Sequence, residues 1–357
     1  MVKLWSRVAA GVSVAALTLS LAACGGAGGS SGDAAQLNVI VFPGAVGDLI
    51  KKESNKFEQE NNVKIRFTEA SSVEAVAKIT AAKANPEYDV AFVGDQDLYR
   101  GTDAGLWASL GPSVDTSTVH PEFKDKANNG VPLGVLVTGL FYNKEVFDKE
   151  GWPAPTSFQD LLDQKYCGKV GITNASLIYG VYAVLGLGGL TQAQAQAGDL
   201  DGAWNAGLQK LAAHKDCVPT FETSSAAYEQ KIQTGQYIIG DYASVRLLPL
   251  KKAGVPIELV TPPEGGYGGL TMVAAVKDSP NPDMAQRYLN FVLKPDVQTS
   301  LMENTFYSPS VQSVVVTPAL VDLGMVTEEE LQKMIFPNAT VARKLSGWLD
   351  EFQRSVG

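Results

Sequence analysis

Residues 131–142 read Val-Pro-Leu-Gly-Val-Leu-Val-Thr-Gly-Leu-Phe-Tyr, and this apolar run decides the fold. Its β-branched and aromatic residues predict a buried strand, but the run is longer than an ordinary strand of about five or six residues. Thr138 and Gly139 lie inside it. We therefore expect a strand that leaves one lobe of the molecule and enters a second, with Thr138 and Gly139 as hinge residues.

The sequence before this run predicts alternating strands and helices. Strands are expected over 36–42, 63–67 and 89–93, with helices over 48–60 and 72–83 between them. Strands that alternate with helices at this spacing form right-handed βαβ units. The first lobe is therefore expected to hold a parallel sheet flanked by helices.

The sequence after the run repeats the alternation and predicts a second α/β lobe. A glycine cluster at 265–269 and a strand expected over 270–276 then predict that the chain returns to the first lobe. The predicted fold is thus a two-lobed α/β protein whose parallel-rich sheets are hinged by crossing strands. The expected division is 36–137 plus 272–325 for lobe 1, 138–271 for lobe 2, and 326–357 for a C-terminal helical tail.

The N-terminus has the features of an export signal. Lys3 and Arg7 precede an uncharged apolar run over 9–21, which is shorter than the ~20 residues of a transmembrane helix and is typical of a signal peptide. Residues 21–24, Leu-Ala-Ala-Cys, resemble the bacterial lipobox, which implies cleavage before Cys24 and a lipid on that residue. The alternative is an ordinary signal peptide whose cleavage site happens to contain a cysteine.

A lipid anchor would place the folded body just outside a membrane. The tract 25–32 consists of Gly, Ala and Ser, which predicts a flexible tether. Residues 1–23 would then be removed as the signal peptide, and 24–35 would join the lipid to the body. The expected location is the outer face of the bacterial cell membrane, on the periplasmic side if the cell has an outer membrane.

Two cysteines remain in the expected mature chain. Cys167 and Cys217 would lie in an oxidising compartment, where a disulfide is the usual state of such a pair. That bond would close a loop of about 50 residues and stabilise the fold by about 4 kcal/mol in the chain-entropy model. The alternative is two unrelated buried thiols.

The charge and the missing motifs argue against several classes of function. The formal charge of −9 argues against a nucleic-acid platform, which requires a basic patch. His120 and His214 lie far apart in the sequence and form no zinc pattern, and neither a phosphate-binding G-x-x-x-x-G-K-[ST] loop nor a G-x-S-x-G nucleophile elbow is present. We therefore expect no enzymatic activity, no cofactor and no metal.

A cleft between the two lobes is the expected binding site. In open parallel sheets, ligands bind beyond the carboxyl ends of the strands, where helix N-termini present free N–H groups. Two such lobes joined by crossing strands form a hinged cleft. The residues that follow the expected strands supply the candidate ligand-binding residues, which are Phe42, Gly44, Asp95, Asn174, Ser176, Ser224, Ser225, Tyr242, Arg246 and Thr271.

Four stretches of the chain resemble one known family. They are 137–147 (Val-Thr-Gly-Leu-Phe-Tyr-Asn-Lys-Glu-Val-Phe), 153–161 (Pro-Ala-Pro-Thr-Ser-Phe-Gln-Asp-Leu), 165–170 (Lys-Tyr-Cys-Gly-Lys-Val) and 282–298. In this order and spacing, they resemble the bacterial extracellular solute-binding lipoproteins of ABC importers, in the branch that binds polyamines, γ-aminobutyrate, thiamine and ferric iron. The resemblance implies a type II periplasmic-binding fold, a monomer that binds a small solute, and a membrane permease as its partner.

The resemblance also bears on the ligand. In the polyamine binders acidic residues hold the amines, but the matching positions here are Thr271 and the segment 174–178, which has no carboxylate. The adjacent tyrosine pair of the ferric-iron members is absent. Arg246, which ends the run Tyr-Ala-Ser-Val-Arg, resembles the arginine of an amino-acid-binding subgroup and would form a bidentate pair with a carboxylate.

Several candidate side chains also have an ordinary structural interpretation. Arg246 fits a solvated helix surface, and Tyr242 fits a buried core as well as a ligand contact. Ser224 and Ser225 fit the N-cap of a helix expected from residue 226, and Asp95 fits a turn or an N-cap as well as a contact to an ammonium group.

We expect a solute-binding component of an ABC importer whose solute carries a carboxylate or another anion. The alternatives are a binding protein for polyamines or another cation, a secreted enzyme, or a lipoprotein that senses its ligand without transporting it.

Overall fold

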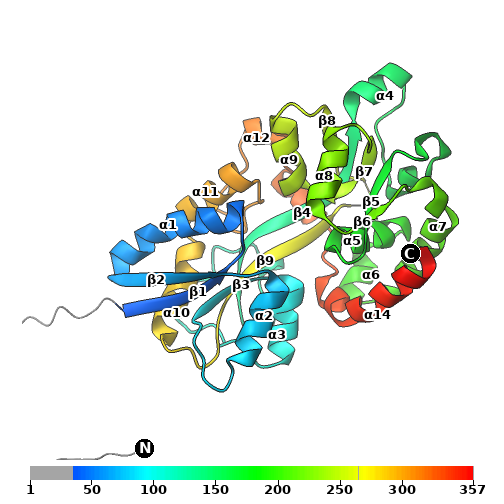
Figure 1. The fold of residues 1–357 in the computed structure, drawn as a ribbon. Coiled ribbons are helices and arrows are strands. Elements are labelled where there is room, and N and C mark those ends of the chain that lie inside the picture. The colour runs from blue at the N-terminus through cyan, green and yellow to red at the C-terminus, as the bar shows by residue number, and fades with distance from the viewer. Residues whose placement is uncertain (1–34, 264, 357) are drawn as a thin grey trace, which may run out of the picture. The chain divides into compact units, whose positions relative to one another are not determined.

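The computed structural model describes residues 35–263 and 265–356 (Figure 1). The expected signal peptide, Cys24 and nearly all of the expected tether lie outside the described residues. The described chain begins with β1 (Ala35–Val41), α1 (Ala45–Asn61), β2 (Val63–Glu69), α2 (Ser72–Ala81) and β3 (Val90–Gly94). Strand β1 pairs in parallel with both β2 and β3, which confirms the predicted βαβ units.

The long apolar run forms one strand, β4 (Val131–Asn143). Its first half pairs antiparallel with β9 (Tyr267–Ala275), which in turn pairs antiparallel with β3. Strands β4 and β9 run side by side in Figure 1, in green and yellow. These two strands therefore connect the N-terminal part of the sheet with the rest of it, as crossing strands must.

The second half of β4 joins the remaining strands, which are β5 (Val170–Thr173), β6 (Phe221–Glu222), β7 (Ile239–Ala243) and β8 (Ile257–Val260). Strand β4 pairs antiparallel with β7 and β8, and β5 pairs in parallel with β6 and β7. The described strands form one sheet in the order β2-β1-β3-β9-β4-β7-β5-β6, with β8 beside β4. Both ends of the sheet are thus parallel, and the crossing is antiparallel.

The helices of the second half of the chain cover these strands. They are α4 (Lys144–Glu150), α5 (Ile178–Leu187), α6 (Gln192–Ala197), α7 (Asp201–Ala213), α8 (Ser225–Gln233) and α9 (Ser244–Lys252). Toward the C-terminus follow α10 (Pro282–Val292), α11 (Pro295–Thr305), α12 (Pro318–Leu323), α13 (Glu328–Gln332) and α14 (Asn338–Val356).

Separate hydrophobic cores lie on the two sides of the crossing. Val137 packs in the core around β1 and β3, and Leu140 packs in the core around β5 and α5. The chain therefore passes from one core to the other at Thr138 and Gly139. This is the two-lobed α/β architecture that the sequence predicts, and the two bodies are called lobe 1 (the β1–β3 side) and lobe 2 (the β5–β7 side) below.

Helix α3 (Asp95–Asp103) is not predicted by the sequence, which indicates only a turn after β3. Its residues, Asp-Gln-Asp-Leu-Tyr-Arg-Gly-Thr-Asp, contain too few apolar side chains for a clear periodicity. Leu98 is buried in the lobe 1 core, and Trp107 donates its indole N–H to the Leu98 carbonyl at 2.9 Å. Tertiary packing therefore forms this short helix where local propensity is weak.

Helix α5 begins at Ile178, four residues after Asn174, where β5 has already ended. Asn174 Oδ1 accepts the backbone N–H of Ser176 at 2.9 Å, so the polar side chain closes a turn instead of allowing helix there. Residues Phe158–Leu162 form a 3-10 helix that is capped by Ser157.

The expected C-terminal tail packs into the body of the protein. Val341, Trp348 and Phe352, all in α14, are buried in the lobe 2 core. The predicted disulfide is also present, between Cys167 and Cys217.

Candidate functional site

Arg246 projects from the first turn of α9, directly after β7. Half of its side-chain surface is exposed, and its Nη1 lies 3.8 Å from Glu229 Oε1. Burial lowers the pKa of Arg246, but Tyr179, Tyr242 and Glu229 raise it by more, so the net shift is upward. The guanidinium is therefore a permanent positive charge that solvent still reaches.

Three tyrosine rings form the wall beside this charge. The Tyr179 ring meets Tyr242 edge-on with centroids 4.9 Å apart, and Tyr242 lies 4.7 Å from Tyr228. Tyr242 is fully buried and donates its hydroxyl to Glu229 Oε1 at 3.2 Å. Burial raises the pKa of both Tyr179 and Tyr242, which keeps their hydroxyls protonated at neutral pH. Tyr242 is thus a core residue whose hydroxyl helps to hold the partner of Arg246.

Lobe 1 contributes two hydroxyls near the same guanidinium. Thr271 Oγ1 lies 3.4 Å from the hydroxyl of Tyr307, and both residues are largely buried. Burial raises the pKa of Tyr307, against smaller opposite effects of the Thr271 hydrogen bond and of the Arg246 charge. The Arg246 charge also opposes the rise in the pKa of Tyr179. Arg246 therefore lies within electrostatic reach of hydroxyl groups from both lobes.

Asp95 is the first residue of α3 and is buried. Its Oδ2 accepts the backbone N–H of Leu270 at 2.9 Å, and its Oδ1 accepts that of Gln96 at 2.8 Å. In lobe 2, Tyr182 has a pKa raised mainly by burial and also by the Asp95 charge. Asp95 thus fixes the start of α3 against β9 and places a carboxylate opposite lobe 2.

The remaining polar candidates are mostly engaged in local structure. Ser224 is the N-cap of α8, since its hydroxyl accepts the N–H of Ala227 at 3.4 Å. Ser225 hydrogen-bonds the hydroxyl of Tyr242. Asn174 closes the turn with the exposed Ser176 described above. For Ser224 the helix-capping interpretation is therefore the one that the structure supports.

The two candidates after β1 mark the beginning of α1. Phe42 is half-buried against the lobe 1 core, and Gly44 precedes the helix with a φ of +84°, a conformation that favours glycine. Gly44 thus has a backbone role.

The expected hinge residues are tightly packed. Thr138 is fully buried, and its hydroxyl has no hydrogen-bond partner among the described residues. A Cβ atom on Gly139 would lie 2.8 Å from the carbonyl oxygen of Val260, so the close approach of β8 requires glycine there. The hinge function of both residues stays a prediction.

Three residues of the cluster around Arg246 were not predicted. Candidate residues were expected just after the carboxyl ends of strands, which we call the strand-end rule. Tyr179 lies in α5, beyond the turn that follows β5, and Glu229 lies in the middle of α8. Tyr307 follows α11 and no strand, so the strand-end rule gives no signal for it.

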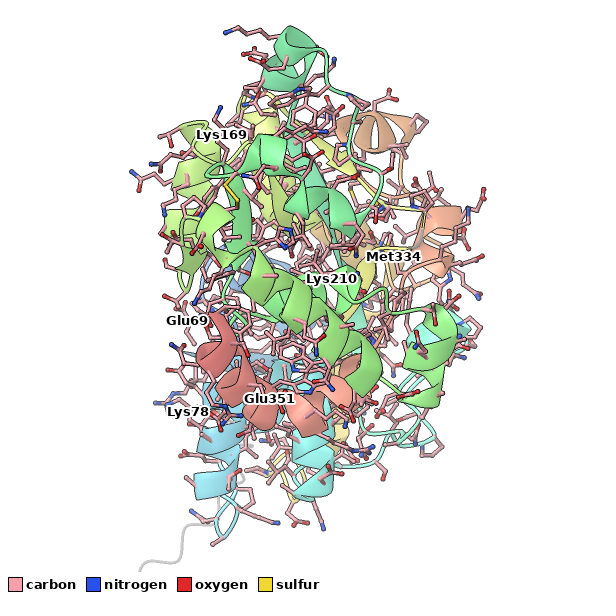
Figure 2. All side chains as sticks on the ribbon, turned by 90° about the vertical axis from the view of Figure 1, so that its right-hand side faces the viewer. Glu69, Lys78, Lys169, Lys210, Met334 and Glu351 are labelled. Atoms are coloured by element: carbon pink, nitrogen blue, oxygen red, sulfur yellow. A yellow bond between two sulfur atoms is a disulfide. The ribbon has the colours of Figure 1, made fainter. Side chains whose placement is uncertain are left out.

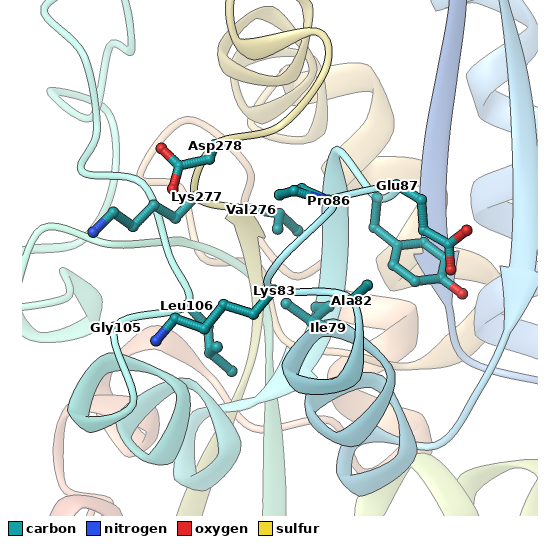
Figure 3. A pocket seen from close by; sticks show the side chains of 11 residues that line it. Ile79, Ala82, Lys83, Pro86, Glu87, Gly105, Leu106, Val276, Lys277 and Asp278 are labelled. Carbon is teal, nitrogen blue, oxygen red and sulfur yellow. The ribbon is translucent and has the colours of Figure 1, made fainter.

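One cavity lies at the edge of the cluster around Arg246, and another lies away from it. One of about 620 Å³ is lined by residues of β4, α9, β8 and the segment around α12, including Gly139, Tyr242 and Ser244. The other, of about 310 Å³, lies at the far end of α2 and is drawn in Figure 3. Its Lys83 is already engaged, since the ammonium group donates to the Ala104 carbonyl at 2.8 Å. None of the predicted ligand-binding residues lines the second cavity.

Within residues 35–263 and 265–356, no three His, Cys, Asp or Glu side chains are placed to hold a metal ion. No helix in this part of the chain is long and apolar enough to cross a membrane.

Comparisons with known proteins agree with this fold. A family model described as bacterial extracellular solute-binding protein matches residues 54–325. The spermidine/putrescine-binding periplasmic protein of Escherichia coli is 23% identical over 313 residues, which cover 85% of this chain and 82% of that protein.

Two solved structures are similar in fold at low sequence identity. The Atu4243-GABA receptor superposes with a TM-score of 0.76 at 19% identity, over 90% of this chain and 98% of that one. Iron-bound HitA from Pseudomonas aeruginosa has a TM-score of 0.72 at 18% identity, over 89% of this chain and 99% of that one. The names of these three proteins mention spermidine and putrescine, GABA, and iron, respectively. The three proteins therefore do not share one ligand.

Proposed function

The chain belongs to the family of bacterial extracellular solute-binding proteins, and from this premise we propose that it binds a small solute with a carboxylate or another anionic group. As the solute-binding component of an ABC transporter, it works with permease subunits in the membrane. The proposed solute enters between the two lobes and is released to the permease unchanged. In this account the protein makes and breaks no covalent bond.

The single observation that carries the proposal is the setting of Arg246. Its guanidinium is permanently charged and half-exposed, its ion-pair distance to Glu229 is long at 3.8 Å, and its hydrogen bond to Tyr179 is to a neutral hydroxyl. A guanidinium in this state can form two parallel hydrogen bonds with a carboxylate or a similar anion.

The neighbouring hydroxyls support the same ligand class. Tyr179 and Tyr307 have raised pKa values, so both stay neutral and can donate to an anion. They come from lobe 2 and lobe 1, respectively. A solute held by both would bind the closed state more tightly than the open one, which is the condition for ligand-driven closure.

Asp95 extends the proposal to amino-acid-like solutes. Its carboxylate belongs to lobe 1, opposite Tyr182, and an ammonium group is its natural complement. A solute with an anionic group near Arg246 and an ammonium group near Asp95 would use both charges. A polyamine has no anionic group for Arg246, and the Thr271 position offers it a hydroxyl in place of a carboxylate.

We also propose that Cys24 carries a lipid that anchors the protein outside the membrane. Labelling of the cellular protein with a radioactive or clickable fatty acid tests this, because a Cys24→Ala variant should be secreted without the label. Equal labelling of the variant would refute the anchor.

The ligand class is tested by identifying the solute that copurifies with the protein. Protein purified from its native cells is denatured, and the released small molecules are identified by mass spectrometry. We expect a stoichiometric compound with a carboxylate, phosphonate or similar group. A stoichiometric polyamine would overturn the proposal.

A further inference from the structure

Helix α14 is fixed to lobe 2 by its apolar face. The Trp348 ring stacks on Trp204 of α7 with centroids 4.4 Å apart and planes 8° apart. The Trp204 indole N–H donates to Glu351 at 2.7 Å. Lys344 forms an ion pair with Asp201 at 2.8 Å. Figure 2 shows α14 in red beside green α7, with Glu351 and Lys210 labelled on the two helices.

The same helix also packs along α3, which belongs to lobe 1. This second contact contributes no described side chain of α14 to the hydrophobic cores of lobe 1. Arg343 of α14 is exposed, and its charge acts on the hydroxyl of Tyr99 in α3. Burial and nearby carboxylates, Asp95 first, raise the pKa of Tyr99 to about 12, and Arg343 opposes this rise.

The segment before α14 is attached to the crossing strand. Ile335 donates its N–H to the Gly266 carbonyl at 2.9 Å and accepts that of Gly268 at 2.9 Å. Phe336 packs on Gly268 and lies 5.5 Å from the Phe123 ring of lobe 1. The chain therefore reaches α14 from the crossing itself, beside the place where the lobes move relative to each other.

The two contacts of α14 differ in how readily they separate. Removing Trp348, Phe352 and Val341 from the lobe 2 core would expose a large apolar area, which costs about 25 cal/mol per Å². Separating α14 from α3 should cost less, because no described side chain of α14 is buried in the lobe 1 cores. When the lobes open, α14 should therefore stay with lobe 2 and leave α3.

We propose that α14 is a latch between the lobes, fixed to lobe 2 by Trp348 and resting reversibly on α3 of lobe 1. The latch connects the lobes in addition to the two crossing strands. Because α3 begins at Asp95, the latch meets lobe 1 on the element that carries this candidate ligand residue. The contact favours the closed arrangement before any solute binds, so the inference does not depend on the identity of the solute.

The test compares three variants of the solute-free protein. Arg343→Ala weakens the contact with α3, and Arg354→Ala is the matched control, an exposed arginine near the C-terminal end of the same helix. Trp348→Ala releases the helix from lobe 2 as well. Small-angle X-ray scattering gives the radius of gyration, and hydrogen–deuterium exchange gives the protection of α3, α7 and α14.

We expect Arg343→Ala to increase the radius of gyration and to speed exchange in α3 at least threefold, with exchange in α7 unchanged. Arg354→Ala should match the wild type, and Trp348→Ala should speed exchange in α7 and α14 also. If Arg343→Ala leaves both the radius of gyration and the α3 exchange at the wild-type values, α14 is not a latch. No solute is used, so this failure is distinguishable from a failure of the proposed ligand class.

Discussion

Arg246 Nη1 lies 3.8 Å from Glu229 Oε1, while Tyr242 donates to the same carboxylate oxygen at 3.2 Å. Glu229 thus orients the arginine through a weak ion pair and also places a negative charge near the proposed anion site. A bound anion and Glu229 would repel each other across Arg246. A mutation of Glu229 can therefore separate its orientation of Arg246 from its repulsion of a bound anion.

The Glu229→Gln variant should bind an anionic solute more tightly than the wild type. The amide keeps an acceptor for the Tyr242 hydroxyl and removes one negative charge, a change of roughly 1 kcal/mol or about fivefold in affinity for a charge pair at this kind of distance. Isothermal titration with the copurified solute measures the effect. Glu145→Gln, on the exposed surface of α4, is the control, and weaker binding by Glu229→Gln alone would show that orientation of Arg246 matters more than repulsion.

Asp241 should destabilise the protein increasingly as the pH rises. Its carboxylate is fully buried with no hydrogen-bond partner in any other described residue, and burial raises the pKa of Asp241 well above the ordinary 3.8, against a smaller opposite effect of its own backbone N–H. Above the ordinary pKa of 3.8, the unfolded state has released the Asp241 proton while the folded state still retains it. The free energy of unfolding therefore falls as the pH increases from 3.8 toward the raised pKa of the folded state.

Replacing Asp241 with Asn should remove this pH dependence. We expect the free energy of unfolding of Asp241→Asn, relative to the wild type, to be higher at pH 8 than at pH 5, by about 1.4 kcal/mol for each pH unit over which the folded wild type keeps the proton. Urea unfolding at the two pH values measures it. An equal difference at both pH values would mean that the folded protein binds no extra proton at Asp241 between pH 5 and pH 8, so that its pKa is not raised above this range's lower end.

The disulfide should contribute a large share of the stability. Cys167 and Cys217 are 50 residues apart in the sequence, and a cross-link of that span stabilises by about 4 kcal/mol in the chain-entropy model. The Cys167→Ala/Cys217→Ala double variant should show this loss in urea unfolding under oxidising conditions. An unfolding free energy equal to that of the wild type would show that the bond only joins chain segments already held together by packing.

Gly139→Ala should destabilise the protein by about 1–3 kcal/mol, because the added methyl group would lie 2.8 Å from the Val260 carbonyl oxygen. Gly202→Ala, in α7, is the control, since a Cβ there meets nothing within 4 Å and should be neutral or stabilising. Thermal unfolding of both variants checks the pair. If Gly139→Ala keeps its stability, the close approach of β8 is not the reason for glycine at that position.

The sequence predicts the architecture well because the crossing strand is apolar along its whole length. The 131–142 run shows in one segment that the chain joins two cores, and β4 confirms it. Helix α3 escapes prediction because its charged residues depend on the burial of Leu98 for their helical form.

The candidate site is only partly predictable from the sequence, because some of its residues are brought together by contacts between distant parts of the chain. Arg246 lies just after the end of β7, where ligands are expected, whereas Thr271 lies inside β9. Tyr179 and Tyr307 come near the guanidinium through long-range packing. Ser224 fits its ordinary structural interpretation, since its hydroxyl caps α8. A short polar side chain after a strand serves a helix N-terminus and a ligand equally well, and the sequence does not distinguish them.

The most direct test of the central claim is a thermal-shift screen of the wild type and Arg246→Ala. The panel contains amino acids, polyamines, carboxylates, phosphonates and thiamine, and a bound compound raises the unfolding midpoint by mass action. We predict that an anionic or amino-acid-like compound stabilises the wild type, and that Arg246→Ala binds it more than tenfold more weakly while Arg354→Ala binds it normally. Stabilisation by polyamines alone, or an equal shift in Arg246→Ala, would contradict the account.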